Sequence, residues 1–226
     1  MIGIDYSRAA LPVGSRTGAA HKNTLRALAT PGAWWSGPER LAIVRETRAA
    51  PECPLCHART RSTFTTIGGI EHDSSNGLPP EAVEVVHGMR NDSGHLTRHW
   101  FDHVIAAGMR PEAYVELVAI VASSVVVDTF AQGVGLGLPD LPQAQPGTPT
   151  PESSRDVVDA GAWVPIAREG RFNIIRSLAI VPSARDLFFG AFDNSYYRTP
   201  ETRFALARPQ VELIASRVSA MNECFY

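Results

Sequence analysis

The chain of 226 residues is long enough for one large domain or two small ones, and its 44% hydrophobic content is ordinary for a globular core. A formal net charge of -2 provides no electrostatic footprint for nucleic acid or an anionic membrane surface, so neither is expected as a partner. The first twenty residues contain an early acid and no apolar run as long as a secretory signal needs. They predict a mobile arm, 1–20, on a cytoplasmic protein.

Helical periodicity dominates the rest of the sequence, with prolines, glycines and capping residues at the expected helix ends. No alternating apolar run is bounded by hairpin turns, so an all-α fold is predicted. The apolar run 117–127 is fenced by Glu116 and Asp128 and is too short to cross a bilayer, which favours a buried helix. In chain order the expected helices are 23–30, 38–50, 54–67, 78–91, 93–108, 110–135, 172–192 and 199–226, with Ser93 a candidate cap and Gly108 a stop.

A segment rich in Pro, Gly, Ser and Thr predicts an extended linker at 139–160. It separates a first helical domain, 21–138, from a second unit, 161–226. The two sides share a faint repeat, because 23–34 parallels 173–188 in its Asn, Arg, Leu, Ala and Pro residues. The second copy is therefore interpreted as an incomplete duplicate of the first.

Cys53 and Cys56 form a Cys-x-x-Cys motif at a predicted helix start, with Pro54 as the first helical residue. Backbone N–H groups at a helix start lower the pKa of the first thiol, and the second thiol is placed to resolve a mixed disulfide. This spacing predicts redox chemistry. Burial of two cysteines as small apolar side chains is an equally open interpretation.

Two further interpretations of this motif involve a bound group. The sequence Cys-x-x-Cys-His is also the attachment signal for c-type haem, but that chemistry requires export. A zinc site built from Cys53, Cys56 and His57 lacks a second ligand pair at finger-like spacing. Other histidines could complete such a site through space, namely His72, His95, His99 and His103. The pair His99 and His103 shares one helical face. A metal pair is one interpretation, and a solvated or capping face is the one we favour.

Several buried-looking polar and aromatic residues adjoin the apolar helices. Glu46, Glu116 and Asp128 adjoin apolar helix stretches, where burial would raise the pKa of a carboxylate. Because no partner is visible in the sequence, we interpret them instead as helix-edge or intersubunit residues. Trp34 and Trp35 are expected in the core or in an oligomer interface.

The C-terminal sequence VELIASRVSAMNECFY resembles the active-site helix pair of the AhpD-like alkylhydroperoxidase and carboxymuconolactone decarboxylase superfamily. In the peroxidase branch, eleven residues separate a glutamate from a Cys-x-x-Cys motif that a histidine follows, and Glu212 and Cys224 have this separation. The resemblance implies an AhpD-like helical bundle, assembled into trimers or hexamers. It also implies catalytic roles for Glu212 and Cys224.

In that family the second cysteine attacks the peroxide, the first resolves the sulfenic acid, and Glu and His relay protons. The attacking position would follow Tyr226, so we expect the motif to be interrupted there, either at an ordinary Cys-x-x-Cys or at a selenocysteine whose codon is read as stop. The C-terminal site is then expected to be weak or inactive as written. A codon other than TGA after Tyr226 would exclude selenocysteine.

The first copy departs from the family pattern, because Glu39 lies fourteen residues before Cys53 and Thr60 stands where the histidine is expected. Cys53 and Cys56 are thus either a divergent redox site or a structural pair. The implied activity is thiol-dependent reduction of peroxides or disulfides, with electrons from a dithiol carrier protein and no cofactor. The alternatives are a cofactor-independent lyase of the decarboxylase kind, using Glu116 and His103 in a subunit cleft, and a non-catalytic helical oligomer with inert thiols.

Overall fold

The computed structural model describes residues 3–61, 72–170, 173–196 and 206–221, and this part of the chain is mainly helical, as predicted. Two short strands, β1 and β2, form an antiparallel pair in which Val157 faces Ala167 and Val158 faces Ile166. They are too short for a periodic signal in sequence. The helices are α1 (Ser15–Leu28), α2 (Gly37–Ala49), α3 (Pro54–Arg61), α4 (Pro80–Asn91), α5 (Arg98–Ala106), α6 (Pro111–Gly133), α7 (Asn173–Ser177), α8 (Pro182–Phe192) and α9 (Arg208–Met221), and the strands are β1 (Val157–Val158) and β2 (Ile166–Ala167).

Local sequence signals account for most helix ends. Ser36 and Glu39 form a capping box at the start of α2, with the Ser36 backbone N–H donating to Glu39 Oε2 over 2.8 Å. The cap of α5 is Thr97, not Ser93, because residues 93–95 form a separate 3-10 turn. After α5, Gly108 adopts a φ of 117°, which suits glycine and ends the helix as predicted.

The N-terminal region is more ordered by packing than its polar sequence suggests. Helix α1 begins at Ser15, earlier than the predicted 23, because His21, Thr24 and Leu25 bury one face of it. Within 1–20, Ile4 is 5% exposed. The hydroxyl of Tyr6 lies 2.5 Å from His21 Nδ1, which ties this segment to α1.

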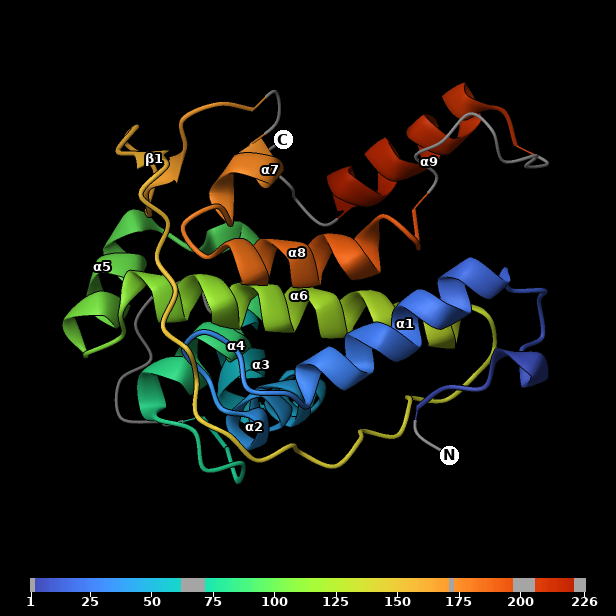
Figure 1. Ribbon diagram of the computed structural model, residues 1–226, viewed down its shortest axis with the longest axis horizontal. Coiled ribbons are helices and arrows are strands. Elements are labelled where there is room, and N and C mark those ends of the chain that lie inside the picture. Colours follow the sequence, from blue (N-terminus) through green and yellow to red (C-terminus); the bar gives the residue numbers. More distant parts are fainter. Residues whose placement is uncertain (1–2, 62–71, 171–172, 197–205, 222–226) are drawn as a thin grey trace.

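Helix α6 lies at the centre of the fold and packs against α8 on one side and against α2 and α4 on the other (Figure 1). It is the one described helix long and apolar enough to cross a membrane, but 61% of its most apolar 18-residue stretch is buried inside the protein. The main hydrophobic core contains Ile120 of α6, Val44 of α2 and Phe188 of α8. Segments on both sides of the predicted linker therefore share one core.

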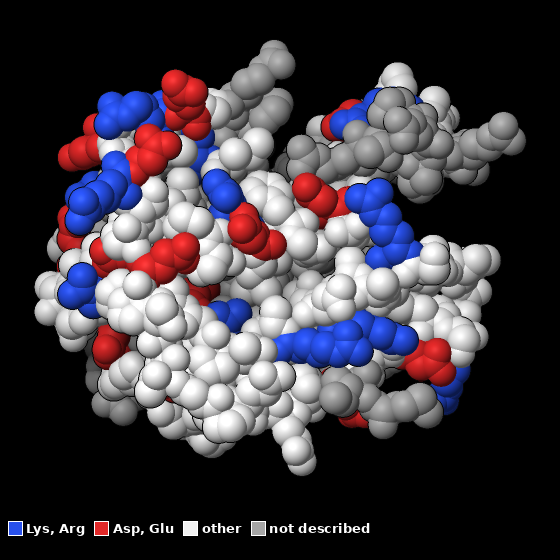
Figure 2. All heavy atoms as spheres, viewed as in Figure 1, with Lys and Arg blue, Asp and Glu red and all other residues white. Residues whose placement is uncertain are grey.

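The predicted linker is extended up to residue 154 and follows the surface of the helices in Figure 1. Its backbone N–H groups at Gln145, Thr150 and Ser154 donate to the carbonyls of Ala29, Gly32 and Ile180 at 2.8, 3.0 and 2.8 Å. These bonds fix the segment along its length. On the face shown in Figure 2, acidic and basic side chains are interspersed.

Candidate thiol and metal site

The candidate site lies where α2, α3, α4 and the segment after residue 72 meet. Cys53 precedes α3 and Cys56 lies in its first turn, while His87 comes from the middle of α4. Glu46 projects from α2 into the same interior region, where it is fully buried. The fold thus gathers side chains that are up to 41 residues apart in sequence.

The two cysteines are reduced thiols in different environments. Burial raises the pKa of Cys53, but hydrogen bonds from the backbone N–H of Cys56, from His72 and from the backbone N–H of Asp73 lower it to about 6. Burial raises the pKa of Cys56 to about 11, and the neighbouring Cys53 adds to the rise. Cys53 is therefore the thiol that ionises first.

His87 connects Cys56 to a carboxylate. Its Nδ1 atom lies 3.4 Å from Cys56 Sγ, and its Nε2 atom lies 2.7 Å from Glu46 Oε1. Burial raises the pKa of Glu46, but hydrogen bonds from Asn76, His87 and Ser74 lower it below its ordinary value overall. This arrangement orients the imidazole, because the ionised carboxylate favours a proton on Nε2 and leaves Nδ1 facing sulfur.

His72 makes a second, parallel connection. Its Nδ1 atom lies 3.5 Å from Cys53 Sγ and 3.7 Å from Cys56 Sγ, while its Nε2 atom lies 2.8 Å from Glu84 Oε2. Burial raises the pKa of Glu84, but His72, Trp100 and Arg59 lower it to about 2. Burial lowers the pKa of His72, and the bonds to Glu84 and Cys53 raise it above its ordinary value.

The four groups that face one another can also bind a metal ion. One ligand atom from each of Cys53, Cys56, His72 and His87 lies within 4.8 Å of the other three. Thiolate and imidazole are the ligands that Zn²⁺ prefers in proteins. The same atoms therefore support either thiol chemistry or metal binding.

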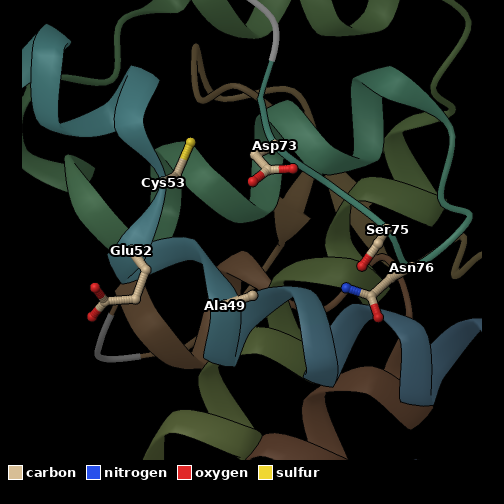
Figure 3. Close-up of a pocket in the computed structure, with 6 residues that line it drawn as sticks. All are labelled: Ala49, Glu52, Cys53, Asp73, Ser75 and Asn76. Atoms are coloured by element: carbon tan, nitrogen blue, oxygen red, sulfur yellow. The ribbon is translucent and has the colours of Figure 1, made fainter.

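A pocket of about 270 Å³ lies beside the cluster. Figure 3 shows that Cys53 lines it together with Asp73, while the carboxylate of Glu52 points away from Asp73. Its other lining residues are Ala49, Ser75 and Asn76. Cys53 is the member of the four-residue cluster that lines this pocket.

The structure places the other predicted histidines elsewhere. His57 Nε2 lies 2.6 Å from the carbonyl oxygen of Pro51, on the exposed side of α3. His95 contacts Asp92, and both His99 and His103 are exposed on α5. Of the through-space donors proposed from sequence, His72 joins the cysteines.

The C-terminal motif is described only in part. Glu212 lies on α9, where it forms an ion pair with Arg208 and accepts a hydrogen bond from Tyr196 Oη at 3.4 Å. Figure 1 shows α9 well apart from α3. Cys224 lies outside the described residues, so its predicted role stays a prediction.

The remaining predicted site residues are engaged in the core. Glu116 is 1% exposed, pairs with Arg40 and accepts a hydrogen bond from the backbone N–H of Trp34 at 2.5 Å. Glu116 is thus a core residue and not the helix-edge residue predicted, and burial raises its pKa although Arg40 opposes the change. Trp35 is also buried, and its indole N–H donates to the carbonyl of Ala113 over 2.9 Å.

Asp128, the third predicted carboxylate, pairs with Arg48. Both Asp128 oxygens accept hydrogen bonds from the Arg48 guanidinium at 2.8 Å, at the partly buried edge between α2 and α6. This bidentate pair joins the two helices, in agreement with the predicted helix-edge position.

His87 and Glu84 are the site residues that sequence reasoning missed. His87 stands in the apolar run VEVVHGM, where its full burial predicts a polar partner, and Glu84 lies three residues earlier on the same helix. A lone histidine on an apolar helical face was the available signal. It names no partner, because Glu46 and Cys56 come from other helices.

Comparison with family models, with curated proteins and with solved structures finds no match for the chain.

Proposed function

We propose that the chain is a thiol-dependent oxidoreductase that reduces peroxides or disulfides through Cys53 and Cys56, within an AhpD-like helical fold. The observation that carries the proposal is the chain of contacts from Glu46 through His87 to Cys56, next to a second thiol that faces a pocket. A thiol pair with an oriented base is what such chemistry requires.

The different environments of the two thiols support different roles in the proposed reaction. Cys53 has the lowered pKa and lines the pocket, so its thiolate is the attacking group. It attacks one oxygen of the peroxide, the O–O bond breaks, and the leaving oxygen takes a proton to form an alcohol or water. Cys53 becomes a sulfenic acid. This order is the reverse of the one that the resemblance implies for the C-terminal motif.

Cys56 then resolves the sulfenic acid. His87 Nδ1 accepts the Cys56 proton, and the resulting imidazolium is stabilised by Glu46 through Nε2. The Cys56 thiolate attacks Cys53 sulfur, the hydroxyl leaves as water after taking a proton, and a disulfide forms. Two electrons from a dithiol partner protein reduce this disulfide and restore both thiols.

The duplication and the oligomer belong to the same proposal. The parallel segments 23–34 and 173–188 begin within α1 and at the start of α7. In a duplicated AhpD-like protein, Glu212 and Cys224 would belong to a second thiol site, separate from the first. A trimer or hexamer would bury the side chains of Leu213, Ile214, Val218 and Met221, which are 51% to 80% exposed on α9.

The test is peroxide consumption by reduced, chelator-treated protein with a dithiol as electron source. Cys53→Ser and Cys56→Ser should each abolish turnover, while Cys224→Ser and the exposed control His99→Ala should retain it. In Cys56→Ser, a sulfenic acid trapped by dimedone should map to Cys53. Retained turnover in both cysteine variants would exclude this pair, and a dimedone adduct on Cys56 in Cys53→Ser would reverse the assigned roles.

A further inference from the structure

The cluster of Cys53, Cys56, His72 and His87 has the dimensions of a tetrahedral metal site. Three of the four sulfur-to-nitrogen distances are 3.5 Å (Cys53 to His72), 3.7 Å (Cys56 to His72) and 3.4 Å (Cys56 to His87). With Zn–S bonds of about 2.3 Å and Zn–N bonds of about 2.0 to 2.1 Å, a regular tetrahedron has a sulfur-to-nitrogen edge of about 3.6 Å. These three distances lie close to that edge, and all four donor atoms lie within 4.8 Å of one another.

Carboxylates orient both imidazoles for this task. His87 Nε2 bonds to Glu46 Oε1 at 2.7 Å, and His72 Nε2 bonds to Glu84 Oε2 at 2.8 Å. A carboxylate on the outer nitrogen fixes the tautomer that presents a lone pair on the inner nitrogen, and metal-binding histidines in proteins commonly have such a partner. The arrangement occurs twice here: the inner nitrogen of His72 faces both sulfurs, and that of His87 faces the sulfur of Cys56.

The carboxylates are themselves held in place. Glu46 Oε2 accepts hydrogen bonds from Ser74 Oγ at 2.7 Å and from Asn76 Nδ2 at 2.8 Å. Glu84 accepts from Arg59 at 3.1 Å and from the Trp100 indole N–H at 2.9 Å. Each histidine is therefore oriented by a carboxylate that is itself held by two further side chains, as a site with fixed geometry requires.

Burial and charge favour a soft divalent cation. Cys53, Cys56 and His87 are 3%, 5% and 0% exposed, and the side chain of His72 is 7% exposed. Two thiolates and two neutral imidazoles carry a charge of about -2, which one divalent ion neutralises in the interior. A set of two sulfurs and two nitrogens selects against Mg²⁺ and Ca²⁺, which take oxygen ligands.

We propose that Cys53, Cys56, His72 and His87 bind one Zn²⁺ ion in a closed site. The ion would join the start of α3 to α4 and to the segment that begins at His72. This inference stands on donor geometry and does not depend on the redox function. The two proposals describe alternative states of the same sulfurs, because the metal-bound form has both thiolates occupied and the thiol chemistry belongs to the metal-free form.

The first test is the metal content of the full chain purified under reducing conditions, measured by inductively coupled plasma mass spectrometry. We expect one zinc per chain. After removal of zinc by a chelator, Co²⁺ should produce the visible d–d bands of tetrahedral coordination and a thiolate-to-cobalt charge-transfer band. Iron in place of zinc, or octahedral cobalt spectra, would overturn the assignment.

Variants separate ligands from bystanders. Cys56→Ser, His72→Ala and His87→Ala should lose stoichiometric zinc, whereas His57→Ala, His99→Ala and Cys224→Ser should keep it. Because a ligand variant can fail to fold, Glu84→Gln provides a milder change: it leaves all four ligands in place and should weaken zinc binding roughly 10- to 100-fold with unchanged circular dichroism. Wild-type zinc affinity in both histidine variants would overturn the site.

The two proposals fail separately. Zinc binding is measured without peroxide, and peroxide turnover is measured on chelator-treated protein. Zinc at one per chain without turnover would leave the metal site standing and remove the redox function. Turnover by folded protein that binds neither zinc nor tetrahedral cobalt would leave the redox function standing and remove the metal site.

Discussion

Arg40 and Glu116 form an ion pair inside the protein, where their side chains are 7% and 1% exposed. The pair joins α2 to α6, and Glu116 also accepts the backbone N–H of Trp34. Burial lowers the pKa of Arg40 and raises the pKa of Glu116, and each charge opposes the change in the other. Because both side chains are buried, bulk water cannot solvate one charge if the other is removed. Each charged side chain is therefore stabilised by the other.

Removal of one member of this pair should be strongly destabilising. Arg40→Met leaves Glu116 buried without its counter-charge, and we expect a loss of about 3 to 5 kcal/mol in the free energy of unfolding by urea. The exposed pair Arg98 and Asp102 provides the control, since Arg98→Met should cost no more than about 1 kcal/mol. If Arg40→Met costs as little as Arg98→Met, the buried pair does not contribute as described.

Gly32 packs directly against this ion pair. A Cβ atom at this position would collide with both Glu116 Oε1 and Arg40 Nη1. Gly32→Ala should therefore cost about 1 to 3 kcal/mol of stability, through displacement of the pair. Gly133→Ala is the control, because no atom apart from its neighbouring residues and its own helix backbone lies within 4 Å of the added Cβ. Equal unfolding midpoints for the two variants would contradict the close approach.

His21 should make stability depend on pH. It is fully buried between Tyr6 and Ser195, and burial lowers its pKa to about 4. The unfolded chain, with a pKa near 6.5, takes up the proton first as pH falls. The contribution of neutral His21 to the free energy of unfolding is complete above about pH 6.5. It decreases by up to about 3 kcal/mol as the pH falls toward 4.

Urea unfolding of wild type and His21→Gln at pH 7.5 and 4.5 isolates this effect, because other titrating groups are common to both proteins. Wild type should lose more stability than the variant between the two pH values. Parallel losses would show that His21 takes up its proton in the folded state as readily as in the unfolded chain.

The thiols of the chelator-treated protein should alkylate in a fixed order. Cys53 should react with iodoacetamide with a midpoint near pH 6, because hydrogen bonds stabilise its thiolate, while Cys56 should stay unreactive until alkaline pH. Mass spectrometry of the labelled peptides distinguishes the two. His72→Ala should move the Cys53 midpoint upward, and an unchanged midpoint would show that His72 does not stabilise the thiolate.

The sequence was most informative where one helix carries its own signal. Pro54 places both cysteines at the start of α3, and Ser36 with Glu39 begins α2 where predicted. The start of α1 was missed because its first residues are polar, and tertiary contacts of His21 stabilise them. The local sequence pattern therefore predicts a helix start correctly where the helix propensity of the residues and their burial in the fold agree.

The ligand set could be predicted only in part. Cys-x-x-Cys spacing names two of the four groups, and His72 was one of several through-space candidates. His87 is brought to Cys56 by the packing of α4 against α3, which no spacing in the sequence encodes. The neighbouring histidines His57, His99 and His103 are equally suitable by residue type, so the fold alone selects among them.

The central position of α6 has a consequence for synthesis. Helix α8, which covers one side of α6, follows it only after the extended segment and the β1–β2 pair. A growing chain that has not reached Pro182 contains the whole of α6, but the apolar side chains that α8 later covers are exposed to water. Molecular chaperones bind exposed apolar surfaces of this kind. Ribosome-bound chains that stop before α8 should be retained by chaperones, and those that extend past Phe192 should be released.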